Sequence, residues 1–319
     1  MHRIDNRTRR SSAAASVEGG RAATFTAFGL AAEAQPIAPG LYLVATPIGN
    51  LGDVTLRALK TLAAANAVLA EDTRVTKTLL AHYGITTPLV AYHEHTGEAV
   101  RDRMIARLRE GQSLALVSDA GTPLVSDPGY RLVEAAIAEG LPVIPIPGAS
   151  AALAALVVAG LPTDRFFFEG FLPAKSGPRR SRLEALASIP GTLVLYEAPH
   201  RIAESLADAA AVLGPRPAAV ARELTKLHET VRRGRLDELA ARYAQEGAPK
   251  GEIVLLIAPA TEEERQAEAE IGLDDKLKAA LARHTVKDAA ALVAGETGLP
   301  RRDIYARALS LARGGDETP

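Results

Sequence analysis

The sequence predicts two successive α/β domains followed by a small helical module. Apolar runs alternate with helical patterns from Gly40 to about residue 260, the segment Gly160–Asp164 interrupts them, and the pattern after residue 276 is purely helical. Short buried strands that alternate with helices are typical of βαβ units and a mostly parallel sheet. We therefore expect α/β domains at residues 40–160 and 165–260, and a small helical module at residues 276–313.

Residues 1–39 differ from the rest in being rich in Ala, Arg, Ser and Gly, with little periodicity. They lack the apolar stretch of a secretory signal, and Asp5, Glu18 and Glu33 disfavour a transit peptide. We predict a disordered N-terminal extension or a start codon placed too far upstream.

The first domain is expected to contain five strands with helices between them. The predicted strands are Leu41–Ala45, Ala67–Ala70, Leu89–Tyr92, Leu114–Ser118 and Val143–Ile146. The predicted helices are Asp53–Ala65, Thr73–His82, Glu98–Glu110 and Pro128–Glu139.

The second block repeats the alternation. Its predicted strands are Arg165–Glu169, Leu193–Glu197, Ala218–Arg222, Thr230–Gly234 and Glu252–Ala258, with helices near Arg179–Ala187, Arg201–Val212 and Leu236–Gln245. In the last block, Gly298–Leu299–Pro300 supplies a helix stop and a new start between Lys287–Thr297 and Arg301–Arg313. Helices this short are not expected to bury a core alone, so we expect the module to dock on a larger partner surface.

Composition excludes several classes of function. With no cysteine, a disulfide framework, a cysteine-ligated zinc site and a cysteine nucleophile are excluded, and a reducing cytoplasm is the expected compartment. No apolar run reaches the roughly 18 residues that span a bilayer. The net charge of −1 means that any contact with nucleic acid must come from a local basic patch.

Three loops of small residues each follow an apolar strand. They contain Pro47 and Gly49; Asp119, Ala120, Gly121 and Pro123; and Pro147, Gly148 and Ser150. Glycines let a ligand approach the backbone closely, and ligands of open α/β sheets bind beyond the carboxyl ends of the strands. The usual Gly-rich dinucleotide and P-loop patterns are missing, so these loops form the predicted binding site.

Several long motifs occur in a characteristic order: LYLVATPIGNLGDVTLRALKTL, EDTR, SDAGTPLVSDPGY, PGAS, GLPTDRFFFEGFLPAK, YEAPHRI and ARELTKLHET. Over residues 40–260 the chain closely resembles the ribosomal RNA small subunit methyltransferase I family of the tetrapyrrole-methylase-like superfamily. The helical tail resembles the family's C-terminal helix-turn-helix-like module, which we expect to dock on a larger domain or on RNA. In that family the third loop usually reads Pro-Gly-Pro, whereas Ala149 follows Gly148 here. We expect a looser loop there and not a lost site.

The resemblance implies a homodimer that binds S-adenosyl-L-methionine between two α/β domains. It also implies methylation of the ribose 2′-oxygen of a cytidine in the decoding region of 16S rRNA, within the small ribosomal subunit. The three loops are then the cofactor site.

Removing the proton of a 2′-hydroxyl requires a positioned base, and a desolvated lysine or a carboxylate would serve. The motifs offer Glu71, Asp72, Arg74, Glu197, His200, Arg222, Glu223 and Lys226. We favour Lys226 and Glu223 as the catalytic residues, because they occupy a loop at a strand end. Structural ion pairs are the alternative for each.

For RNA contact we predict Arg74, Lys175, Arg179, Arg180 and Arg201, with a second basic cluster at Arg232, Arg233 and Arg235. A solvated charged face is the alternative. His93, Glu94 and His95 lack a third ligand nearby in sequence, so we predict no metal site.

Two other functions remain open at this stage. The chain could methylate a small molecule such as a corrin precursor, or a protein as diphthamide-type methylases do. The helical module could instead make it a DNA-binding regulator. The EDTR motif and the basic Gly-Pro loop disfavour the first, and two large α/β domains disfavour the second.

Overall fold

The computed structural model describes residues 23–93, 97–261, 270 and 272–314. The chain divides into two compact units, Met1–Ser150 and Ala151–Pro319. Within the described ranges no helix has both the length and the apolar composition needed to cross a membrane.

The first unit contains a five-stranded, fully parallel sheet with the strand order β5-β4-β6-β3-β7. Its strands are β3 (Gly40–Val44), β4 (Ala67–Ala70), β5 (Leu89–Ala91), β6 (Ser113–Val117) and β7 (Val143–Ile146). All lie within two residues of the predicted strands. Buried parallel strands read as continuous apolar runs, which is why the sequence identifies them well.

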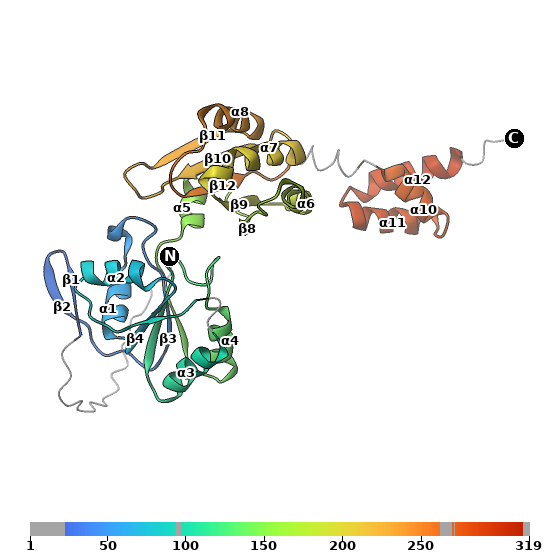
Figure 1. Ribbon diagram of the computed structural model, residues 1–319. Helices are drawn as coiled ribbons and strands as arrows, with labels where there is room; N and C mark the ends of the chain where they lie inside the picture. Colours follow the sequence, from blue (N-terminus) through green and yellow to red (C-terminus); the bar gives the residue numbers. More distant parts are fainter. Residues whose placement is uncertain (1–22, 94–96, 262–269, 271, 315–319) are drawn as a thin grey trace, which may run out of the picture. The chain divides into compact units, whose positions relative to one another are not determined.

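Helices cover both faces of this sheet (Figure 1). They are α1 (Leu56–Ala64), after the 3-10 turn η1 (Leu51–Asp53), α2 (Thr73–His82), α3 (Glu98–Arg109) and α4 (Tyr130–Ala138). Val44 belongs to the core with α1 and α2, whereas Leu41, three residues earlier, belongs to the core with α3 and α4. This follows from side chains alternating between the two faces of a strand.

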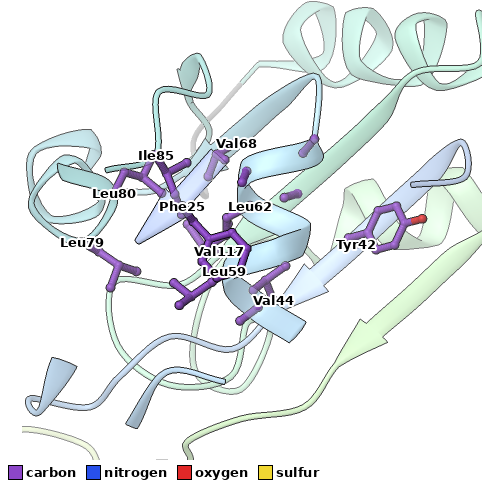
Figure 2. Close-up of a cluster of buried hydrophobic side chains, with 14 of the residues drawn as sticks. Phe25, Tyr42, Val44, Leu59, Leu62, Val68, Leu79, Leu80, Ile85 and Val117 are labelled. Carbon is purple, nitrogen blue, oxygen red and sulfur yellow. The ribbon is translucent and has the colours of Figure 1, made fainter. Parts of the chain in front are cut away.

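A hairpin of β1 (Thr24–Ala27) and β2 (Leu30–Glu33) precedes the sheet. Figure 2 shows Phe25 of β1 among the aliphatic side chains of α1 and α2, and Phe25 is only 2% exposed. Burying such a ring contributes about 1.5–3 kcal/mol. The prediction of disorder over residues 1–39 is therefore wrong for this segment, because a single buried aromatic has no periodicity to detect. Residues 1–22 lie outside the described ranges.

The second unit contains a mixed sheet with the order β11-β10-β12-β9-β8. Its strands are β8 (Phe166–Phe171), β9 (Thr192–Glu197), β10 (Pro217–Arg222), β11 (Thr230–Arg235) and β12 (Ile253–Ile257). Only β8 and β9 pair in parallel, across the crossover helix α6 (Ser176–Leu186). The other pairs are antiparallel. The loop between β10 and β11 is too short for a crossover, so these strands form a hairpin.

The remaining helices of this unit's α/β part are α5 (Ala151–Val158), α7 (Ile202–Leu213), preceded by the 3-10 turn η2 (Pro199–Arg201), and α8 (Leu236–Glu246). Helices α6, α7 and α8 share one apolar core with the sheet. Helix α5 contacts β9 and β12. The predicted α/β class of both blocks is thus confirmed.

The C-terminal helices are α10 (Leu273–Leu281), α11 (Val286–Thr297) and α12 (Arg301–Gly314). Gly298, with a φ of +71°, ends α11 just before Pro300, as the turn sequence predicts. The three helices bury a cluster of their own: Leu277, Ala280, Ala289, Ala290, Val293, Ile304 and Ala308. The expectation that helices this short bury no core was wrong, because small alanines let them pack closely.

Candidate cofactor and catalytic site

Three loops meet at the carboxyl edge of the first sheet, because β6, β3 and β7 are neighbours there. The backbone N–H of Thr46 donates to the carbonyl of Gly121 at 2.9 Å, and the Gly121 N–H donates back to Thr46 at 3.1 Å. The Thr122 hydroxyl donates to the carbonyl of Ala149 at 3.2 Å. These bonds join the three loops into one structure, which we call the loop cradle.

Glycine is required at two points of the cradle. Gly121 has a φ of +86°, and a Cβ there would lie 3.4 Å from Cγ2 of Ile48. A Cβ at Gly148 would lie 3.0 Å from Cβ of Ala45, tighter than nearly all real contacts. The backbones therefore approach one another closely at the ends of these strands.

The structure brings the predicted cofactor residues to this one edge of the sheet. Pro47, Gly121 and Pro123 are buried in the cradle; Asp119 and Ser150 are half-buried; Gly49, Ala120, Pro147 and Gly148 are exposed. Sequence reasoning missed Thr46 and Thr122, whose hydrogen bonds join the loops. The only signal for them in the sequence was that each threonine directly precedes a proline, Pro47 or Pro123.

The loop after β4 joins the cradle through Asp72. Its backbone N–H donates to Oδ1 of Asp119 at 3.0 Å, and its side chain caps α2 by accepting from the Arg74 N–H at 2.8 Å. The Arg74 guanidinium pairs with the same carboxylate at 2.6 Å. Hydrogen bonds from the Arg74 side chain and backbone lower the pKa of Asp72 to about 2. Arg74 itself is 89% exposed and can reach a ligand.

Asp127 lies further along the loop that follows β6. The Ser118 hydroxyl donates to Oδ2 of Asp127 at 2.6 Å and accepts from the N–H of Ala120 at 3.1 Å. Burial raises the pKa of Asp127; the bond from Ser118 opposes this rise, and the charge of Asp119 adds to it. The same loop holds Leu124 and Ser126 at positive φ, a strained conformation typical of functional loops.

Glu223 and Lys226 form an ion-pair cluster in the second unit. The Lys226 ammonium donates to Glu223 at 2.9 Å and to Glu252 at 3.1 Å. Burial alone would lower the pKa of Lys226, but the two carboxylates outweigh it and the pKa is raised. The hydrogen bond from Lys226 is the main cause of the lowered pKa of Glu223. An ammonium held in this way is poorly suited to accept a proton, whereas Glu223 is ionised.

The arginines predicted for RNA contact fall into two groups. Arg179 is only 1% exposed and pairs with Asp208 at 2.7 Å, so its predicted role in RNA contact is wrong for this conformation. Arg201 is 17% exposed, pairs with Glu197 at 3.0 Å and donates to the carbonyl of Leu172. Its guanidinium thus has structural partners.

Lys175 is exposed, and Arg180 is half-exposed beside Asp208. In the second cluster, Arg232 pairs with Glu246, Arg235 pairs with Asp237, and Arg233 donates to the carbonyls of Val158 and Ala159. Arg233 thereby caps the carboxyl end of α5, where a cation is favoured.

Among the described residues no three His, Asp or Glu side chains converge in a way that could hold a metal ion. His93 is exposed, while Glu94 and His95 lie outside the described ranges.

Comparison with known proteins assigns the fold to a class. Residues 40–240 match the family model described as tetrapyrrole (corrin/porphyrin) methylases. Residues 266–312 match the RsmI C-terminal HTH domain. Uroporphyrin-III-C-methyltransferase from Thermus thermophilus aligns with a TM-score of 0.50 at 27% identity over 68% of this chain and 94% of its own. Diphthine synthase aligns at 0.53 and 20% identity, over 68% and 89%, which shows the fold alone.

The chain is therefore a tetrapyrrole-methylase-type methyltransferase. Two relatives specify it further. Ribosomal RNA small subunit methyltransferase I of Mesorhizobium japonicum is 53% identical over 87% of this chain and 94% of its own length, and that of Escherichia coli O157:H7 is 47% identical over 84% and 94%. The chain belongs to the ribosomal RNA small subunit methyltransferase I family, as its motifs indicate, and its methyl donor is S-adenosylmethionine.

Proposed function

We propose that the chain methylates the ribose 2′-oxygen of a cytidine in the decoding region of 16S rRNA. The observation that carries the proposal is the loop cradle at the ends of β3, β6 and β7. It occurs in a chain that is 53% identical to a ribosomal RNA small subunit methyltransferase I. A cytoplasmic homodimer acting on the small ribosomal subunit is part of the same proposal.

The cradle is the proposed seat of S-adenosylmethionine. Backbone groups of Gly49, Gly121 and Gly148 would approach it, since the first two have positive φ and a Cβ on the third would crowd Ala45. Asp119 supplies a carboxylate at the same edge. The bound sulfonium supplies an electrophilic methyl group. Pro47, Ala120, Pro123, Pro147 and Ser150 complete the proposed contacts.

The chemistry requires the 2′-hydroxyl to lose its proton as it takes the methyl group. We assign the acceptor role to Glu223, because its carboxylate is ionised at neutral pH. Lys226 holds and orients that carboxylate from 2.9 Å. Of the two predicted catalytic residues, the carboxylate is thus the proposed base and the lysine the proposed positioning group.

RNA phosphates are the proposed partners of the exposed cations Arg74, Lys175 and Arg180. The side chains of Arg74 and Arg180 are 89% and 52% exposed, and ion pairs made by exposed side chains contribute little, so these cations can turn to phosphate at little cost. Arg179 and Arg201 are left out of this set because their guanidinium groups already have structural pairs.

Nucleoside mass spectrometry of 16S rRNA, from cells with and without the protein, tests the proposal. One 2′-O-methylcytidine should disappear with the protein and return when small subunits are incubated with the purified enzyme and S-adenosylmethionine. The linkage at that nucleotide should resist alkaline cleavage, because the 2′-oxygen is blocked. A methylated base with ordinary alkaline cleavage would contradict the proposal.

A further inference from the structure

The first unit contains a cavity of about 620 Å³ between the end of β5, the start of α3 and the start of α4. None of the residues assigned above to the cofactor or to catalysis lines it. The volume suits a small ligand. Three features of its wall indicate what kind of ligand it takes.

The first feature is an exposed aromatic ring. Tyr130, the first residue of α4, is 68% exposed. It follows Gly129, whose φ is +121° and where a Cβ would lie 2.6 Å from Cδ2 of Leu116. Only glycine lets the chain turn this closely against β6, so the sequence fixes the point from which the ring projects. An exposed ring on a cavity wall is a stacking surface.

The second feature is a pair of guanidinium groups. Burial raises the pKa of the Tyr92 phenol, and the nearby charges of Arg101 and Arg131 oppose that rise. Both arginines line the cavity together with Tyr92, one from α3 and one from α4. Arg101 pairs with Asp102 at 3.2 Å. Arg131 makes no ion pair with any residue that the structure describes, so its charge is available to an anion.

The third feature is a direct connection to the loop cradle. Asp127 lines the cavity and accepts from the hydroxyl of Ser118, which also accepts from the N–H of Ala120 in the cradle. A single hydroxyl thus joins the cavity wall to the proposed cofactor loops. A ligand in the cavity would be held by the same loop that holds the methyl donor.

We propose that this cavity binds one unpaired nucleotide of the RNA substrate, with its base stacked on Tyr130 and its phosphate paired with Arg131. The inference rests on the proposed function and names a substrate subsite for it. Stacking on aromatic rings requires a base that is free of its helix, so duplex RNA does not fit this site. Asp127 and His93 add polar groups for the ribose or the base edge.

Two kinds of RNA and four variants test the proposal. Anisotropy of a fluorescein-labelled single-stranded RNA measures binding, with the duplex of the same sequence as comparison. Tyr130→Ala should weaken binding of the single strand by about 5- to 150-fold, the range measured for one stacked base, and leave duplex binding unchanged. Tyr130→Phe keeps the ring and should bind like the wild type. Arg131→Ala should lower the salt slope of single-strand binding by about 0.7, whereas Arg131→Lys should retain it.

Matched controls lie outside the cavity. Phe28→Ala removes a 91%-exposed ring, and Arg103→Ala removes an exposed cation on α3. Both should leave RNA binding unchanged. Calorimetry should give wild-type affinity for S-adenosylmethionine in every variant, and with small subunits as substrate Tyr130→Ala should raise KM more than it lowers kcat.

Equal losses on single-stranded and duplex RNA would overturn the stacking assignment, as would wild-type binding by Tyr130→Ala. These outcomes do not bear on the proposed function. That function is tested independently, by identifying the methylated nucleoside that the wild-type enzyme forms. If the wild type makes 2′-O-methylcytidine and Tyr130→Ala has an unchanged KM, only the subsite is wrong.

Discussion

The hydroxyl of Ser118 lies 2.6 Å from Oδ2 of Asp127, at the junction of the loop cradle and the cavity beside it. Ser118 is buried just after the end of β6. This bond therefore holds the first residue of the loop after β6 against Asp127, nine residues later in the same loop. Among the described carboxyl groups, Asp127 is the one whose pKa is raised, and burial is the main cause. Its charge therefore costs stability, and its hydrogen bond offsets part of that cost.

Replacing Asp127 by Asn should change how stability depends on pH. A carboxyl with a raised pKa takes up its proton more readily when folded, so the free energy of unfolding falls as pH rises from about 3.8 through the folded pKa. Asp127→Asn should remove that decline and leave the protein at least as stable at pH 7. Ser118→Ala should steepen it by raising the pKa of Asp127 further. Urea unfolding between pH 3.5 and 7 measures these slopes; identical slopes in all three proteins would contradict the prediction.

Thr122→Val should weaken cofactor binding without unfolding the protein. The substitution keeps the shape of the side chain but removes the 3.2 Å bond to Ala149 that joins two cofactor loops. A neutral hydrogen bond contributes about 0.5–1.5 kcal/mol, so affinity for S-adenosylmethionine should fall about 2- to 10-fold by calorimetry. Thr78→Val removes a similar bond on the surface of α2 and serves as the control. Unchanged affinity for Thr122→Val would mean that the methyl donor does not need the joined loops.

Arg179→Ala should destabilise the second unit far more than Arg180→Ala. Both arginines bond to Asp208, but Arg179 is 1% exposed and Arg180 is 52% exposed. Removing one member of a buried pair costs about 3–5 kcal/mol, whereas an exposed pair contributes about 0–1 kcal/mol. Chemical denaturation followed by circular dichroism distinguishes the two. Equal losses of stability in the two variants would show that the burial of Arg179 does not make its pair with Asp208 more important than that of Arg180.

The pair at Asp208 also predicts sensitivity to acid. Burial alone would raise the pKa of Asp208, but bonds from Arg180, Ser176 and Arg179 hold it below its ordinary value. The stability contributed by these bonds is present above about pH 3.8 and is lost as pH falls further, through the lowered pKa. Asp208→Asn should abolish this acid-induced loss in the same unfolding experiment, at the cost of lower stability at pH 7.

Much of the fold could be predicted because its strands are buried on both faces. Thr73–His82 was predicted with its observed bounds, since Asp72 caps it and hydrophobic residues recur on one face. The hairpin at residues 24–33 was missed because its one buried anchor, Phe25, contacts α1 and α2, which come later in the chain. Local patterns carry no information about such a contact.

The site was predicted only to the level of loops. Glycines at 49, 121 and 148 indicated the cradle because close backbone approach is a local property. The burial of Arg179 could not be predicted, because Asp208 lies 29 residues away on the next helix. In the sequence Arg179 and Arg180 are equivalent members of a basic run, and only packing makes one structural and the other exposed.

Lys226→Met should shift the pH dependence of methylation. The bond from Lys226 is the largest cause of the low pKa of Glu223, so its loss raises that pKa. If Glu223 accepts the proton, the acidic limb of kcat/KM should move to higher pH, while Lys226→Arg should retain the wild-type limb. A Lys226→Met enzyme with an unmoved limb would exclude Glu223 as the titrating group. Glu252→Gln, which removes the other partner of Lys226, is the comparison.

A chain that ends at Ala260 should still bind S-adenosylmethionine but methylate small subunits poorly. The C-terminal helices bury their own core, so their removal should leave the α/β units folded. Arg283, Lys287, Arg301 and Arg302 are exposed and can contact phosphate. We therefore expect an increase in KM for the subunit, measured by methyl transfer from labelled cofactor. Loss of cofactor binding on truncation would instead make the module part of the catalytic body.

The strand order of the first sheet has a consequence for synthesis of the chain. The cradle lies between β6, β3 and β7, and its last wall is Pro147–Ser150, at the end of the unit. During translation the loops at Gly49 and Gly121 emerge first, but neither can close the cradle until β7 has been added beside β3. At the proposed cofactor site, binding of the methyl donor therefore becomes possible only once the whole first unit has left the ribosome, which would make cofactor capture a marker of its completion in a growing chain.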